Sequence, residues 1–209
     1  MRYIKITVLL AVFVAFGAEW SIGQSKYRPS ADQINAAVSV APESQQQNAT
    51  VKGYNSEGKL VVLREGTGSL ICVADDPEQS NFHVSCYHKD LEPFMQRGRE
   101  LKARGLGTKK VDSIRQEEIK AGSLKMPRKP MALYSLSGSH DAFDYETSQL
   151  TNASPLYVIY IPFATEESTG LSQKPVSDGA PWIMEPGTPW AHIMVITGKE
   201  IGNQMEEQR

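Results

Sequence analysis

The sequence lacks the short motifs that assign a chain to a common enzyme class. It has no GxGxxG, no GxxxxGKS or GxxxxGKT, no HExxH, no CxxC and no GxSxG. These absences exclude an assignment by motif to dinucleotide-binding, phosphate-loop, metalloprotease, dithiol or α/β-hydrolase proteins. The turn at 66–68 (Gly-Thr-Gly) lacks the context of a phosphate loop. Neither an internal repeat nor a heptad array is visible.

Long apolar segments are absent beyond the N-terminus, and the one near the start is short. Arg2 and Lys5 accompany an almost unbroken apolar run over 6–16. This run is too short to span a bilayer comfortably, and it matches the core of a secretory signal peptide. We expect cleavage before Gln24, with cleavage after Ala18 as the alternative.

No cysteine stands directly after the apolar run, where a lipoprotein anchor would require one, and we therefore expect no such anchor. We therefore expect an exported protein, periplasmic or secreted, with no membrane span after signal cleavage. The composition is that of a globular domain, with 40% hydrophobic and 22% charged residues. The expected organisation is a signal peptide (1–23), an N-terminal linker with a short helix (24–48), a single α+β domain (49–198) and a flexible tail (199–209).

Short apolar runs between turn residues predict strands, and amphipathic runs predict helices. The expected strands are 49–54, 60–63, 70–74, 83–87, 131–136, 156–161 and 191–196, and the expected helices are 31–40, 91–104 and 111–121. The first four strands pair most simply as an antiparallel meander. Residues 156–161 (LYVIYI) are apolar on both faces, which indicates a central strand. The fold class is α+β, a mainly antiparallel sheet packed by two or three helices.

The helix after Asp90 has the clearest amphipathic pattern. Asp90 is a suitable N-cap, and Pro93 lies in the first turn. Apolar residues then follow at helical spacing on one face. Packing this face over the sheet would bury Phe94 and Leu101.

The two cysteines, Cys72 and Cys86, are 14 positions apart and lie on neighbouring expected strands. Strand alternation places Leu70, Cys72 and Ala74 on one face, and Cys86 shares a face with Val84. If these faces meet, the cysteines can form a disulfide that stabilises the fold by roughly 3 kcal/mol. A free buried pair is the alternative. A catalytic thiol is disfavoured because nothing nearby activates either cysteine.

The spacing His83-x-x-Cys86-x-His88 resembles that of metal ligands. On a regular strand, however, His83 points away from Cys86 and His88, so one ion could bind all three only at a bulge or strand end. An oxidised Cys86 would not be a thiolate ligand. Metal binding is the weakest functional alternative, and no cofactor is expected.

His192 lies on an otherwise apolar strand face beside a Pro-Gly turn. It could be a general base or metal ligand of a hydrolase, oriented by His140, Asp141 or Asp144 from a long polar loop. A structural histidine, hydrogen-bonded to a neighbour, is the competing interpretation. A structure that sealed His192 in apolar packing would exclude catalysis.

The leading hypothesis is a non-catalytic domain that binds an envelope partner or a small ligand. Its expected recognition surface is the pair of loops 137–154 and 164–190, with Trp182 and Trp190 as aromatic anchors. The segment 97–129 has eleven Lys and Arg against four Asp and Glu, a net charge of +7 in a chain of −2. Aromatic residues are not interleaved there, which argues against nucleic-acid binding.

Two motifs resemble those of a set of uncharacterised exported bacterial proteins. Residues 63–68 (LREGTG) precede Cys72 and Cys86, and residues 186–194 (PGTPWAHIM) lie near the C-terminus. The family pattern is LR-x-GT-x-G, two cysteines and GTPYAH-x-M, covering most of 49–195. Here Trp190 stands in place of tyrosine, and Ser69 in place of an aromatic residue. The resemblance implies an exported bacterial protein and implies no activity.

Overall fold

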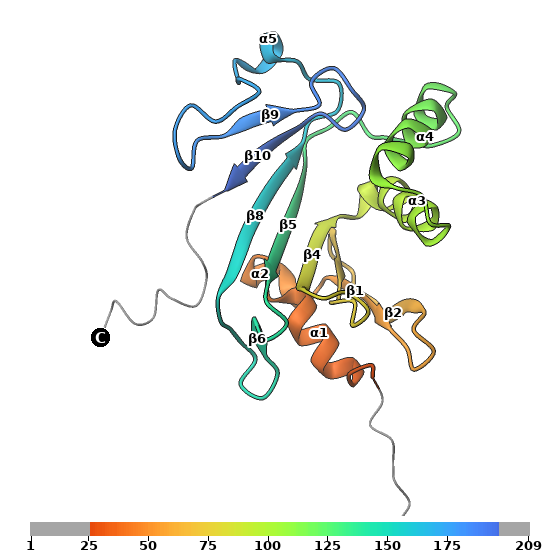
Figure 1. The fold of residues 1–209 in the computed structure, drawn as a ribbon, viewed down its shortest axis with the longest axis vertical. Helices are drawn as coiled ribbons and strands as arrows, with labels where there is room; N and C mark the ends of the chain where they lie inside the picture. Colours follow the sequence, from red (N-terminus) through yellow and green to blue (C-terminus); the bar gives the residue numbers. More distant parts are fainter. Residues whose placement is uncertain (1–25, 197–209) are drawn as a thin grey trace, which may run out of the picture.

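An eight-stranded mixed sheet, ordered β2-β1-β3-β4-β5-β8-β10-β9, forms the centre of the fold (Figure 1). The structure is a computed structural model that describes residues 26–196. The expected signal peptide, both cleavage sites and the expected tail lie outside the described residues. No helix within 26–196 is long and apolar enough to cross a membrane.

The elements follow the expected α+β pattern closely. The helices are α1 (Ser30–Val38), α2 (Glu43–Gln46), the 3₁₀ turn η1 (Lys89–Leu91), α3 (Glu92–Ala103), α4 (Thr108–Lys120) and α5 (Glu166–Thr169). The strands are β1 (Thr50–Tyr54), β2 (Leu60–Arg64), β3 (Leu70–Val73), β4 (Phe82–His88), β5 (Met131–Gly138), β6 (Phe143–Asp144), β7 (Gln149–Leu150), β8 (Ala153–Tyr160), β9 (Trp182–Met184) and β10 (His192–Ile196). The strand β8 lies between β5 and β10, so its central position is confirmed.

The first four strands do not form the expected antiparallel meander. Strand β1 lies between β2 and β3 and pairs with β3 in parallel. The chain from β2 to β3 crosses the start of β1, where Gly66 and Gly68 pack against the backbone around Asn48. A Cβ at Gly66 would lie 2.3 Å from the carbonyl oxygen of Asn48, which is closer than real contacts allow. Gly66 and Gly68 therefore allow the connection from β2 to β3 to pass across the start of β1. The shortness of this connection had instead suggested an antiparallel hairpin.

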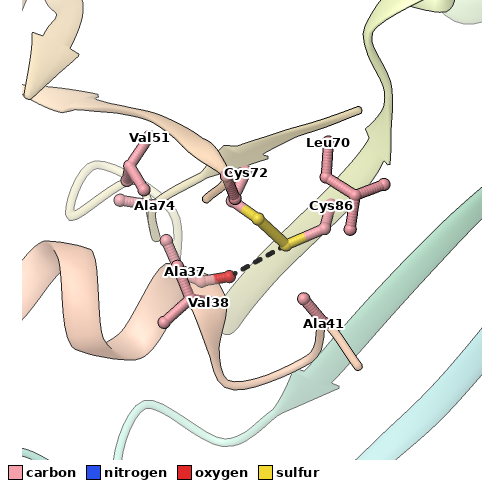
Figure 2. Close-up of a cluster of buried hydrophobic side chains, with 9 residues drawn as sticks. Ala37, Val38, Ala41, Val51, Leu70, Cys72, Ala74 and Cys86 are labelled. Atoms are coloured by element: carbon pink, nitrogen blue, oxygen red, sulfur yellow. Dashed lines mark hydrogen bonds between the residues drawn. A yellow bond between two sulfur atoms is a disulfide. The ribbon is translucent and has the colours of Figure 1, made fainter. Parts of the chain in front are cut away.

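The helix α1 packs on one face of the sheet, against β1 and β4. Its residues Ala37 and Val38 join a buried cluster with Val51, Leu70 and the two cysteines (Figure 2). The compact unit therefore begins at α1, before residue 49. The helix starts at Ser30, one residue before the expected start, and Pro29 is in the N-cap position.

The helix α3 packs on the opposite face. Alternate residues of β4 show this: Val84 and Cys86 cluster on the α1 side, whereas Tyr87 packs with Leu91 and Met131 beside α3. The 3₁₀ turn η1 precedes α3, whose N-cap position is Leu91 rather than the expected Asp90. Phe94 and Leu101 of α3 are buried, as expected.

Candidate functional site

Cys72 and Cys86 lie directly opposite each other on β3 and β4 and form a disulfide (Figure 2). Both side chains are 0% exposed beneath α1. The Sγ atom of Cys86 lies 3.2 Å from the carbonyl oxygen of Ala37. A disulfide sulfur has no hydrogen to donate, so this contact is packing. The expected pairing is confirmed, and Cys86 is neither a thiolate ligand nor a nucleophile in this state.

A groove of about 610 Å³ lies on the other face, between the sheet and α3. Its floor is made of side chains from six strands, arranged in rows that cross the sheet according to the strand register. One row comprises Tyr87, Leu133, Val158 and Met194, which are partners across β4, β5, β8 and β10. The volume is in the range of sites for small organic ligands, roughly 300–1,000 Å³.

One face of α3 forms the wall of the groove. Met95, Gly98, Arg99 and Lys102 line it at positions i, i+3, i+4 and i+7. Arg115 of α4 reaches the groove over Gly98, where a Cβ would lie 2.9 Å from a guanidinium nitrogen. The small residue therefore makes room for a cation from the second helix.

Ion pairs fix part of the basic segment that the sequence singled out. Arg97, Arg99, Arg115 and Lys129 each contact a carboxylate within 2.5–2.7 Å. Two of these pairs lie within the segment, and the other two join α3 and the loop after α4 to the outside carboxylates Glu92 and Asp90.

Glu92 is the centre of a half-buried network beside the groove. Its carboxylate accepts from Lys52 at 2.5 Å, from the Tyr87 hydroxyl at 2.5 Å and from Arg99 at 2.7 Å. Burial opposes ionisation of Glu92, but these donors outweigh it and hold its pKa below the usual value. Burial, together with Glu92, raises the pKa of Tyr87, which keeps its hydroxyl protonated as a donor.

We expect Glu92→Gln to lower the free energy of unfolding at neutral pH by about 2–3 kcal/mol, since it leaves Lys52 and Arg99 without their carboxylate. The pKa of Glu92 is lower in the folded protein than in the unfolded chain, where it is near 4.5. The ionised carboxylate therefore stabilises the folded state fully above pH 4.5, and this stabilisation is lost as the pH falls through the folded-state pKa. Urea unfolding should therefore show a difference in free energy of unfolding between the wild type and Glu92→Gln that is smaller at acid pH than at neutral pH. Glu100→Gln, at a more exposed pair, is the control, and an equal loss at every pH would contradict the expectation.

His192 does not lie near the loop residues His140, Asp141 and Asp144 that were proposed to orient it. It lies at the end of the sheet marked by Tyr160 and Met131, whereas His140 follows the opposite end of β5. Seven residues of strand separate these ends, or roughly 23 Å. The Nδ1 atom of His192 lies 2.6 Å from the carbonyl oxygen of Trp190. The hydrolase arrangement is not assembled in the structure.

The carboxylates of the polar loop have local partners. Asp141 accepts from the Ser139 hydroxyl at 2.5 Å, and Asp144 accepts from the backbone and hydroxyl of Thr147 in the β6–β7 hairpin. These hydrogen bonds lower the pKa of both carboxyls. His140 lines a smaller cavity of about 260 Å³ together with Asp75.

His83, Cys86 and His88 do not converge on one point. His83 faces the groove, whereas Cys86 faces α1. The Nδ1 atom of His88 accepts from the backbone of Asp90 at 3.2 Å. Within residues 26–196, no three His, Cys, Asp or Glu side chains are grouped so that they could hold a metal ion.

His83 does have a serine partner that the sequence gave no reason to expect. Its Nδ1 atom lies 2.9 Å from the hydroxyl of Ser137 on β5. Asp75 accepts from the backbone N–H of His83, at 2.8 Å. Because that carboxylate is bonded to the backbone, it does not orient the imidazole as a catalytic triad requires.

The two tryptophans have different roles. Trp190 packs against Phe94 with ring centroids 6.3 Å apart, so it supports α3. Trp182 is half-buried on the edge strand β9 and shares the groove side with its partner Met194. The loops 137–154 and 164–190 lie at opposite ends of β5 and β8 (Figure 1), so they do not form the single recognition surface that was expected.

The residues of the two sequence motifs hold loops in place. Arg64 donates to the carbonyl oxygens of Gln46 and Ala49, which fixes the crossover between β2 and β3. In the second motif, the N–H of Gly187 donates to Ala164, and the carbonyl of Thr188 accepts from Phe163. Both motifs thus have structural roles outside the floor of the groove, except for His192 and Met194.

Comparison of the chain with protein-family models, curated proteins and solved structures gives no match. The groove was not predicted from the sequence, because it depends on how six strands and α3 meet. The only available signal was the second face of the strands, on which Tyr87, Leu133 and Val158 alternate with the residues under α1.

Proposed function

We propose that this protein is an exported, non-catalytic binding domain whose groove takes a small, largely apolar ligand. The observation that supports the site is the concave floor of Leu133, Val158, Tyr160 and Met194 under the wall of α3. Such a surface, with a few polar groups around it, is typical of small-molecule sites. The buried disulfide supports export, since disulfides persist in oxidising compartments.

The distribution of titratable groups favours binding over catalysis. The two histidines of the groove, His83 and His192, are separated by three strand spacings across the sheet and by six residues along the strands. This corresponds to a distance of roughly 24 Å. Each has its Nδ1 atom beside a local oxygen. Acid–base chemistry by this pair on one small substrate would need both within hydrogen-bond reach of it.

A neutral apolar probe tests the site directly. We expect N-phenyl-1-naphthylamine to bind saturably with a rise in fluorescence. Leu133→Arg and Met194→Arg place a charge on the half-buried floor and should each weaken binding about tenfold or more, which corresponds to about 1.4 kcal/mol. Val62→Arg is the matched control, because Val62 is an apolar strand residue, 44% exposed, on β2 outside the groove.

Circular dichroism and thermal melting establish that each variant is folded before its affinity is compared. Absence of saturable binding to the wild-type protein would contradict the proposal. Equal affinity in the wild type and both folded floor variants would place the probe elsewhere and would also contradict it.

A further inference from the structure

The groove differs in character between its two ends. At one end the floor is polar: Ser85 and Ser135 are direct partners across β4 and β5, and His83 lies in the next row with Ser137. At the other end it is apolar and aromatic, with Met184 and Tyr160 beside His192. A ligand lying along the groove would therefore meet a hydrogen-bonding end and a hydrocarbon end.

The helix α3 places one uncommitted cation over the polar end. Lys102 lies two turns after Met95 on the wall of the groove. Partial desolvation lowers the pKa of the His83 imidazole, the Asp75 carboxylate raises it, and the charge of Lys102 adds a smaller lowering effect. The other cations of the groove have partners, because Arg99 pairs with Glu92 and Arg115 pairs with Asp112. Lys102 makes no ion pair within residues 26–196.

Acidic side chains are missing from the lining of this groove. Glu92 is adjacent but is fully engaged by Lys52, Tyr87 and Arg99. A free ammonium, an imidazole and two serine hydroxyls therefore face the polar end. The nearest carboxylate, Asp75, lies outside the lining and accepts from the backbone N–H of His83. Charge-assisted hydrogen bonds to an anion are the complementary interaction.

We propose that the groove binds an amphiphile with one anionic head group, which lies at Lys102 and His83 while its apolar chain extends toward Tyr160 and Met194. This inference rests on the proposed function and specifies its ligand class. The shared chemistry is a single-chain carboxylate or phosphate ester. The hydrocarbon chain supplies burial against the floor, and the head group sets the direction in which the ligand lies.

Competition with the neutral naphthylamine probe tests this assignment with ligands of one chain length. Dodecanoate, dodecyl phosphate, dodecanol and dodecyltrimethylammonium are titrated below their micellar concentrations. We expect the two anions to compete about tenfold more strongly than the cation, with dodecanol between them. The stronger of the two anions identifies the head group.

Lys102→Met tests the head-group contact itself, since it removes the charge and keeps the aliphatic stem. We expect about a tenfold loss in affinity for dodecanoate or dodecyl phosphate and no change for dodecanol, whereas Lys102→Arg retains anion binding. Lys110→Met is the matched control, because Lys110 is an exposed cation on α4 that does not line the groove.

The outcomes separate this proposal from the broader one. Equal competition by anionic and cationic amphiphiles would overturn the head-group assignment, and probe binding would still support an apolar ligand site. The same loss for dodecanol as for the anions in Lys102→Met would also overturn it, because Lys102 would then act through packing. Failure of every ligand and of the probe would remove both proposals.

Discussion

Phe94→Ala is expected to lower the free energy of unfolding by about 3–5 kcal/mol, the cost typical of a buried phenylalanine. The ring is 2% exposed and packs with Tyr160 and Trp190, each with centroids 6.3 Å away. The guanidinium of Arg115 lies 3.8 Å from the ring centroid. Truncation would therefore leave a cavity beneath α3 and remove the cation–π contact that joins α4 to it.

Urea unfolding followed by fluorescence and circular dichroism would measure this loss. Phe163→Ala is the control, since Phe163 is half-buried in a loop and its ring contacts Arg128 at 4.1 Å. A loss for Phe94→Ala no larger than that of the control would mean that α3 is not anchored as described. Because α3 forms the wall of the groove, the naphthylamine probe should also bind less well to the Phe94 variant.

Replacing both cysteines with alanine is expected to cost about 3 kcal/mol. The disulfide closes a loop with a sequence separation of 14, and its removal restores the freedom of that loop in the unfolded chain. Truncating two fully buried side chains under α1 adds a packing loss. The double variant should unfold at a lower urea concentration than the wild type, and reduced wild-type protein should show a similar shift.

Intact mass supplies the control for this experiment. The denatured protein should weigh two hydrogens less before reduction than after it. A fully reduced mass, or a double variant as stable as the wild type, would contradict the structural role of the bond. Native reduction should be slow, because both sulfur atoms are inaccessible until the cover of α1 opens.

The disulfide and most elements could be predicted because they depend on local patterns. The alternation of side chains along β3 and β4 predicted the faces on which Cys72 and Cys86 lie, and the strand register places the two residues directly opposite each other. The helical spacing after Asp90 likewise predicted the burial of Phe94 and Leu101. In these cases the period of the hydrophobic pattern was sufficient.

Features that depend on distant contacts were missed. The parallel pairing of β1 with β3 depends on the close approach of Gly66 to the backbone at Asn48, which loop length does not reveal. The short strand β9 forms by pairing with β10. The hydrolase hypothesis found no support. The position of His192 beside a turn does not reveal whether it lies at the same end of the sheet as His140, and in the structure the two lie at opposite ends.

The strand order has a consequence for how the chain acquires its structure. The strands β1 to β4 occupy one side of the eight-stranded sheet, and β5, β8, β9 and β10 occupy the other, so the pairing of β4 with β5 is the seam that joins the two halves of the sheet. Strand partners within each half are closer in sequence than partners across the seam, which must close over the α3–α4 segment and therefore carries the largest loop-closure cost. We expect the pairing of β3 with β4, which places Cys72 opposite Cys86, to form before the seam does. Probe fluorescence, which requires both halves of the floor, would then report the final step of maturation.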